Sequence, residues 1–150
     1  MSFSIDANVL VYASNASSPN FERARRILVE RSSDLGILYL SWPTLMAYLR
    51  IATHPGIFGA PLDPASALSN VQELLSRPWV RTLSEGEGFL DTYRSVTDGQ
   101  VVRGNLVPDA HLAALLKQNG IRTVLTADAD FRRFPFLDVR NPFLDVVNER

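Results

Sequence analysis

The sequence predicts an α/β fold in which a mainly parallel central sheet is flanked by helices. Short apolar, β-branched segments alternate along the chain with segments whose apolar residues recur at helical spacing, and this alternation is typical of strand–helix–strand units. No repeat, low-complexity tract or long linker interrupts the 150 residues. The length fits one domain, so we expect residues 1–150 to form a single unit.

The N-terminal part contains the first two predicted strands. Residues 3–5 form a short strand that ends at Asp6, and residues 7–13 form a short helix. Residues 20–31 place apolar side chains on one helical face and arginines on the other, which predicts an amphipathic helix. Residues 37–40 are a continuous apolar run, which is typical of a buried strand.

The middle of the chain has clear helix-start residues. Ser41 is a candidate cap for a helix at residues 42–53, because a proline follows in its first turn. Asp63 precedes a second helix that extends to residue 75, and residues 80–83 form the next strand.

The C-terminal part begins with a capping-box spacing. Ser84 and Glu87 stand three residues apart, which predicts a helix that starts there and extends to residue 96. Residues 106–118 form a helix that Asn119-Gly120 ends. The remaining predicted elements are a β-branched strand at residues 121–125, a helical turn at 129–133 and a last strand at 137–139.

Composition and motifs exclude several classes of function. The chain has no cysteine, which excludes disulfides, thiolate metal sites and cysteine nucleophiles. It has no P-loop, no G-x-G-x-x-G and no G-x-S-x-G sequence. A signal peptide and a stretch long enough to span a membrane are also missing. We therefore expect a cytoplasmic protein with no membrane association.

The net charge of −1 gives no general attraction for nucleic acid. Nevertheless, all but one of the 15 basic residues are arginine, which binds phosphate in a bidentate manner. Codon bias in a GC-rich genome explains this composition, and a locally basic surface remains an alternative.

Four aspartates stand at positions where a ligand site forms in α/β proteins. Asp6 follows the first predicted strand, and Asp128 and Asp130 follow the strand at residues 121–125. Ligands bind beyond the carboxyl ends of such strands. Asp109 lies in the first turn of a helix, where the helix dipole stabilises a negative charge.

Three of these four aspartates also have a simpler interpretation. Asp6 and Asp128 can act as helix caps or turn residues, and Asp109 as an ordinary first-turn carboxylate. Carboxylates that gather in one place repel each other, so a cluster generally implies a divalent cation. Oxygen ligands with few histidines favour Mg²⁺ or Mn²⁺ over zinc. His111 can approach this site or lie on a plain helix face.

Several segments resemble PIN-domain proteins, in particular the VapC toxins. They occur in the family's order and span nearly the whole chain: residues 5–13 (IDANVLVYA), 48–55 (YLRIATHP), 108–115 (PDAHLAAL), 125–131 (LTADADF), 133–134 and 140–143.

The resemblance implies a parallel sheet with acidic residues at its carboxyl edge. It also implies Mg²⁺- or Mn²⁺-dependent hydrolysis of RNA phosphodiesters, in tRNA or rRNA, by the toxin of a toxin–antitoxin pair. The positions that match the family are metal ligands at Asp6, Asp109 and Asp128, an accessory catalytic acid at Asp130, and supporting polar residues at Asn8 and Thr126.

The resemblance further implies protein partners. Toxins of this kind are homodimers bound by a small antitoxin, whose tail carries a basic residue into the acidic site. The helices at residues 42–53 and 63–75 are candidate contact surfaces, although their apolar faces can equally line the core.

The chain departs from the family pattern at one position. Ala47 stands where these toxins have a glutamate, and a methyl group cannot bind a metal. Three interpretations follow. Asp130 or another carboxylate completes the site, the site works weakly, or the chain is a silenced module that binds RNA or a protein partner.

Overall fold

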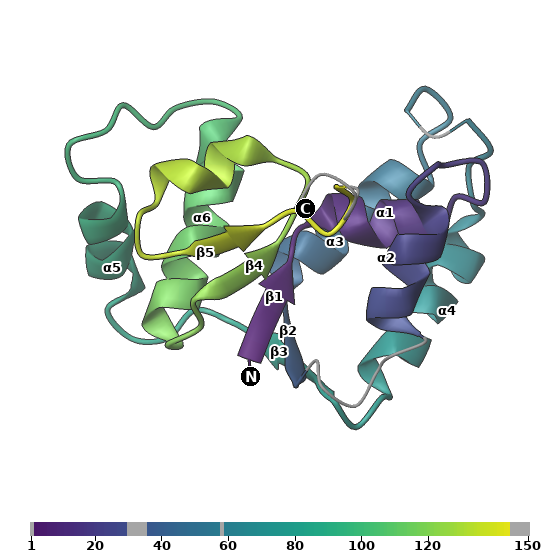
Figure 1. Cartoon of the computed structure of the whole chain (residues 1–150), viewed down its shortest axis with the longest axis horizontal. Coiled ribbons are helices and arrows are strands. Elements are labelled where there is room, and N and C mark those ends of the chain that lie inside the picture. Colours follow the sequence, from purple (N-terminus) through teal and green to yellow (C-terminus); the bar gives the residue numbers. More distant parts are fainter. Residues whose placement is uncertain (1, 30–35, 58, 145–150) are drawn as a thin grey trace, which may run out of the picture.

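The computed structural model describes residues 2–29, 36–57 and 59–144, which form a layered α/β structure (Figure 1). The strands are β1 (Ser2–Ile5), β2 (Ile37–Ser41), β3 (Val80–Leu83), β4 (Thr123–Leu125) and β5 (Asp138–Arg140). The helices are α1 (Ala7–Ala13), α2 (Phe21–Leu28), α3 (Trp42–Ala52), α4 (Pro64–Leu75), α5 (Phe89–Val96), α6 (Leu106–Gln118) and the 3₁₀ helix η1 (Ala129–Arg133).

The five strands form one sheet in the order β3-β2-β1-β4-β5, and every neighbouring pair is parallel. This confirms the predicted fold class. The chain builds outward from β1 on one side, through β2 to β3, and then crosses to the other side for β4 and β5. The strand order therefore reverses between β1 and β4, and in α/β sheets this reversal opens a crevice beyond the carboxyl ends of the strands.

Helices cover both faces of the sheet. The side chains of α1, α2, α3 and α4 pack together in one apolar cluster, and those of α6 and η1 pack in a second cluster. In Figure 1, α1, α2 and α4 lie to the right of the sheet, whereas α5 lies to its left and α6 overlaps β5 on the left side. Right-handed crossover connections require this division when the strand order reverses.

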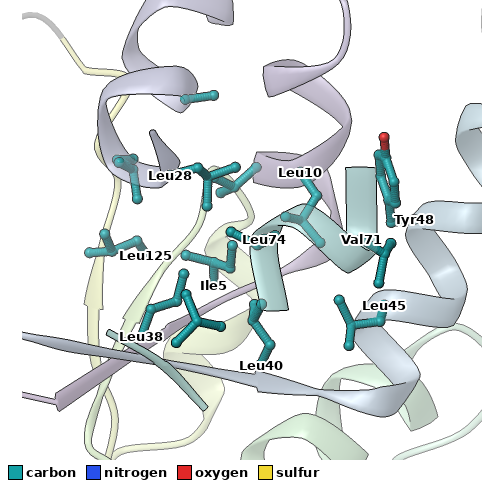
Figure 2. Packing of buried hydrophobic residues seen from close by; sticks show 14 of the residues in the cluster. Ile5, Leu10, Leu28, Leu38, Leu40, Leu45, Tyr48, Val71, Leu74 and Leu125 are labelled. Atoms are coloured by element: carbon teal, nitrogen blue, oxygen red, sulfur yellow. The ribbon is translucent and has the colours of Figure 1, made fainter. Parts of the chain in front are cut away.

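The first cluster joins the N-terminal helices to the middle of the sheet. Figure 2 shows the side chains of α1, α3 and α4 packed with those of β1 and β2. Leu45 of α3 and Leu40 of β2 are fully buried. Burial of a leucine contributes roughly 1.5–3 kcal/mol, so these contacts hold α1 and α3 firmly above the strands that carry the polar residues.

The second cluster fixes α6 against the other face. Five consecutive residues of this helix, from Leu112 to Leu116, are buried. Phe131 of η1 and Phe134, the residue that follows it, are 2% and 0% exposed and pack in the same cluster. The second cluster therefore fixes the position of η1 relative to α6.

The prediction of a capping box at Ser84 and Glu87 was wrong. The helix begins at Phe89, after Gly88, whose φ of 77° is a left-handed conformation that glycine adopts easily. The amide of Gln118 holds the preceding loop instead, because it accepts a hydrogen bond from Gly86 N at 2.9 Å and donates one to Glu87 O at 3.0 Å.

Most other predicted boundaries differ from the structure by one or two residues. The helix predicted at residues 20–31 ends earlier, at Leu28, and residues 30–35 lie outside the described part of the chain. The strand predicted at 121–125 begins at Thr123. In the described parts of the chain, no helix has the length and apolar character needed to cross a bilayer.

Candidate metal centre

Asp6 directly follows β1, at the place where the strand order of the sheet reverses. Its carboxylate caps α1, because Oδ1 accepts a hydrogen bond from Asn8 N at 3.1 Å. The second oxygen, Oδ2, accepts a short hydrogen bond from the Thr126 hydroxyl. Asp6 is only 8% exposed, so burial raises the pKa of its carboxyl above the ordinary value, and the hydrogen bonds oppose this rise.

Thr126 connects the two strands at the switch point. It directly follows β4, which pairs in parallel with β1, so its side chain meets Asp6 across the strands. The same hydroxyl oxygen accepts a hydrogen bond from Asp128 N at 2.9 Å. One buried side chain therefore fixes Asp6 and the backbone that carries Asp128.

Asp128 and Asp130 are arranged by the start of η1. Asp128 caps this short helix, since its Oδ1 accepts a hydrogen bond from Asp130 N at 2.8 Å. The tight turn places the two carboxylates on neighbouring positions at the carboxyl edge of β4. The interpretation of Asp6 and Asp128 as helix caps is therefore correct as local geometry, and it is compatible with their place at this edge.

Asp109 approaches the same place from α6. It lies in the first turn of that helix, as predicted. One carboxylate oxygen from each of Asp109, Asp128 and Asp130 lies within 4.8 Å of the others. Asp6 is not a member of this group, but its charge acts on Asp109 and it responds to the charge of Asp128.

The crowding of carboxylates is visible in the pKa of Asp109. Burial of its side chain, the largest cause, and the charges of Asp128, Asp130 and Asp6 together raise that pKa to about 6. Arg133 acts in the opposite direction. The predicted stabilisation by the helix N-terminus is therefore outweighed, although a carboxyl with this pKa is still mostly ionised at neutral pH.

The donor set suits a hard divalent cation. All members of the group offer carboxylate oxygens, and neither histidine nor cysteine belongs to it in the part of the chain that the structure describes. Mg²⁺ and Mn²⁺ prefer such ligands, whereas zinc sites generally include nitrogen or sulfur. Mutual repulsion of the carboxylates, seen at Asp109, is what a bound cation would relieve.

Two of the predicted polar residues have different positions relative to the acids. Thr126 contacts Asp6 directly and is 1% exposed. Asn8 is exposed, and only its backbone N–H reaches Asp6; no side-chain hydrogen bond joins Asn8 to an acid in the described structure. A supporting role for the Asn8 side chain therefore stays a prediction.

His111 points to a different neighbour. Its Nε2 lies 2.6 Å from Glu85 Oε1, and its ring lies 5.4 Å from that of Phe89. Among the described residues, no hydrogen bond or ion pair joins His111 to Asp109, Asp128 or Asp130. The structure thus places His111 beside the loop between β3 and α5, as a helix-face residue.

Sequence reasoning missed Arg133 as a neighbour of the acids. In the sequence, Arg133 belongs only to a segment that resembles the family, but in the structure its charge reaches Asp109. Its spacing from Asp130 could have revealed it, because residues three apart share one side of a 3₁₀ helix. Ser41 was predicted only as a cap; it is buried and also donates its hydroxyl proton to Thr44 Oγ1 at 2.9 Å, close to where β2 ends.

Ala47 lies on α3, between residues that face the core. Leu45 and Tyr48 are buried in the first cluster, and Ala47 itself is half-buried. The helix therefore lies at the predicted position, but it offers only a methyl group at residue 47. The carboxylates of the acidic group come from α6 (Asp109), from η1 (Asp130) and from the residue that caps η1 (Asp128).

Comparison with known proteins identifies the family. Residues 4–137 match the PIN domain family. The chain is 44% identical over 143 residues to Ribonuclease VapC48 of Mycobacterium tuberculosis, which covers 95% of this chain and 99% of that protein. It is 34% identical to Ribonuclease VapC43 of the same organism, over 92% of this chain and 93% of that protein.

Solved structures share the fold at low sequence identity. VapC20 of M. tuberculosis, described as a Sarcin-Ricin loop cleaving toxin, superposes with a TM-score of 0.66 at 16% identity, covering 93% of this chain and 99% of that one. VapBC2 from Rickettsia felis, bound to a DNA fragment from its promoter, gives 0.64 at 17% identity, with 94% and 98% covered. The parallel sheet, the ordered motifs and these relatives together show that the chain belongs to the PIN-domain family, among its VapC ribonucleases.

Proposed function

We propose that this ribonuclease hydrolyses RNA phosphodiesters, in tRNA or rRNA, at the group formed by Asp109, Asp128 and Asp130, with Mg²⁺ or Mn²⁺ as cofactor. It acts as the toxin of a toxin–antitoxin pair. The observation that carries the proposal is the convergence of these three carboxylates, within 4.8 Å of one another, beside the buried Asp6. Membership of the VapC ribonucleases supplies the reaction class.

The chain's own residues hold and orient the reacting groups. Asp109, Asp128 and Asp130 would hold the cation, which when bound supplies an activated water and stabilises the negative charge of the phosphate. Thr126 keeps the Asp6 carboxylate turned toward the switch point through its hydrogen bond. Asp6 is then placed beside the cation as a further ligand or as an acceptor for the proton of the attacking water.

A catalytically weakened module is the second candidate function. Ala47 favours it, because the family's glutamate would add another carboxylate from α3. Asp130 supports the first candidate instead, since it stands with Asp109 and Asp128 and can complete the oxygen set. We therefore propose an active enzyme whose turnover is lower than that of a site with the glutamate present.

The proposed antitoxin would dock on the helices of the first cluster. A cavity of about 160 Å³ lies there, between α1, α2, α3 and α4. Its floor is apolar, with Leu10, Leu45 and Leu74, and Glu73 and Arg77 also line it. An apolar side chain of a short amphipathic partner fits such a cavity, and both helices expected as contact surfaces, α3 and α4, line it.

A homodimer is proposed as the form in solution. Trp42 and Met46 are 42% and 50% exposed and stand one helical turn apart on α3, which gives this helix an outward apolar face. Sedimentation at micromolar protein concentration measures the state directly. A monomer throughout that range would contradict the dimer.

Cleavage of RNA tests the proposed function. The purified chain is incubated with a mixed pool of tRNA and rRNA in Mg²⁺, Mn²⁺ or EDTA, beside Asp109→Asn as the variant without its carboxylate. We expect cutting that needs the metal and is lost in Asp109→Asn while circular dichroism shows the fold unchanged. Equal cutting by the variant would exclude this site, and absence of both cutting and Mn²⁺ binding by the unaltered chain would favour the silenced module.

A further inference from the structure

The three sides of η1 have three different surroundings. A 3₁₀ helix has three residues per turn, so residues three apart lie above one another. Phe131 occupies the side that faces the core and is 2% exposed. Asp130 and Arg133 share the second side, and Ala129 and Arg132 share the third. Because Asp130 belongs to the acidic group, Arg133 is directed to the rim of that group.

Arg133 is held there by its backbone, and its side chain is available. The carbonyl oxygen of Arg133 accepts a hydrogen bond from Gln100 Nε2 at 2.8 Å, and Phe134, the next residue, is fully buried. The guanidinium is exposed, and it forms no ion pair with any carboxylate in the described parts of the chain. Its charge nevertheless reaches Asp109 and lowers the pKa of that carboxyl.

The charge of the site creates a need for such a cation. Asp6, Asp109, Asp128 and Asp130 carry more negative charge when ionised than one divalent ion offsets. An RNA phosphate that approaches the site is therefore repelled unless another positive group lies at the rim. Arginine is suited to this position because its planar guanidinium binds two phosphate oxygens at once and stays charged.

We propose that Arg133 is a substrate-positioning residue that binds an RNA backbone phosphate next to the one being cleaved. This inference rests on the proposed ribonuclease function and adds to it the group that brings the RNA into register with the carboxylates. Arg132 offers a matched comparison, because it is the same residue type, is also exposed and lies one position away, but on another side of η1.

The test measures RNA binding and metal binding separately. Asp109→Asn serves as the background in which RNA is not consumed, and Arg133→Ala, Arg133→Lys and Arg132→Ala are added to it. Fluorescence anisotropy follows a short fluorescein-labelled single-stranded RNA in Mg²⁺ over a range of KCl concentrations. Mn²⁺ affinity is measured by calorimetry for the Arg133 and Arg132 variants of the otherwise unaltered chain.

We expect Arg133→Ala to weaken RNA binding about tenfold, as the loss of one charge-assisted contact predicts. The slope of log affinity against log salt should fall by about 0.7, which corresponds to one phosphate contact on a single strand. Arg133→Lys should keep the slope and recover part of the affinity, since it keeps the charge without the planar pair of donors. Mn²⁺ affinity should stay equal or rise, because removing a cation cannot weaken metal binding electrostatically.

Two results would overturn the inference. A loss of affinity and salt slope in Arg133→Ala that is no larger than in Arg132→Ala would show that the side of η1 on which Arg133 lies makes no specific phosphate contact. Parallel losses of RNA and Mn²⁺ binding in Arg133→Ala would show a structural role. Neither result would contradict the proposed ribonuclease function. That function is tested separately, by whether the unaltered chain cuts RNA in a way that needs the metal and Asp109.

Discussion

Thr126 controls two carboxylates through one hydroxyl group. It donates to Asp6 and accepts from the backbone of Asp128, and it is buried, so water cannot replace either hydrogen bond. A buried carboxylate that loses its donor is destabilised by the full cost of its desolvation. The position of both acids, and hence the geometry of the site, therefore depends on this side chain.

Replacing Thr126 by valine keeps the shape and removes the hydroxyl. We expect Thr126→Val to lower the free energy of unfolding by about 2 kcal/mol and to reduce RNA cleavage strongly, because Oδ2 of the Asp6 carboxylate loses its donor and only Oδ1 keeps one. Urea denaturation and the cleavage assay measure the two effects. Thr123→Val is the control, since Thr123 is also buried on β4, but in the described structure no hydrogen bond joins its hydroxyl to the acids of the site. A loss of the same size in Thr123→Val, or full activity in Thr126→Val, contradicts the expectation.

The raised pKa of Asp109 predicts a pH-dependent stability. The folded state binds this proton more tightly than the unfolded chain, because the pKa rises from 3.8 to about 6. The stability that Asp109 contributes is therefore greatest at a pH below the pKa that this carboxyl has in the unfolded chain. It is lost as the pH rises through the window from about 4 to 6. Since Asp109 is partly exposed, solvent screens part of this electrostatic contribution, and we expect the change in stability to be on the order of 1 kcal/mol.

Asp109→Asn should remove this loss of stability. In EDTA, we expect the variant to be more stable than the unaltered chain at pH 8, by the order of 1 kcal/mol, with the difference shrinking toward pH 4. Urea denaturation at both pH values measures it, and Asp98→Asn, at an exposed position in the loop after α5, is the control. A variant that is less stable at pH 8 would show that Asp109 is not under electrostatic strain.

At the scale of elements, α3 brings a methyl group to the position where the family has a carboxylate. Ala47→Glu should raise the rate of RNA cleavage several-fold, because another oxygen ligand from α3 would strengthen cation binding. The rate at saturating RNA with varied Mg²⁺ measures this gain. Met46→Glu, one position away on the exposed side of the same helix, adds the same charge without reaching the site and should leave the rate unchanged. An unchanged or lower rate in Ala47→Glu would mean that residue 47 does not correspond to the family's glutamate.

The elements themselves were largely predictable, and the grouping of the acids was only partly so. Apolar runs predicted the strands. Pro43 and Asp63 correctly predicted where helices begin, and Gly120 where one ends, because these signals are local. The capping box failed because Glu87 and its neighbours are held by Gln118, which is distant in the sequence. Asp130 lies close to Asp109 only because η1 packs against α6. No local sequence pattern predicts that packing.

At the scale of the whole molecule, cation binding should stabilise the fold. The carboxylates come from β1, α6 and the segment after β4, so a cation that binds them links parts of the chain that unfolding separates. At a concentration a hundredfold above its dissociation constant, a ligand adds about 2.7 kcal/mol, which corresponds to a rise of roughly 5–10 °C in Tm for a chain of this size. Thermal melts in MnCl₂ and in EDTA, at equal ionic strength, measure the shift.

The variant Asp109→Asn provides the comparison for that shift. Without one of the three clustered carboxylates, we expect most of the Mn²⁺-dependent rise in Tm to disappear. A rise of the same size in the variant would place the cation elsewhere in the molecule.

The position of β1 at the centre of the sheet has a consequence for synthesis on the ribosome. Asp6 is made more than a hundred residues before β4, which pairs with β1 and leads to Asp128 and Asp130. A nascent chain can pair β1 with β2, and β2 with β3, before β4 is made, yet one edge of β1 stays open until β4 arrives. The acidic group therefore cannot assemble before β4 and η1 have been made, so a nascent chain that stops short of residue 123 should not cleave RNA at this site.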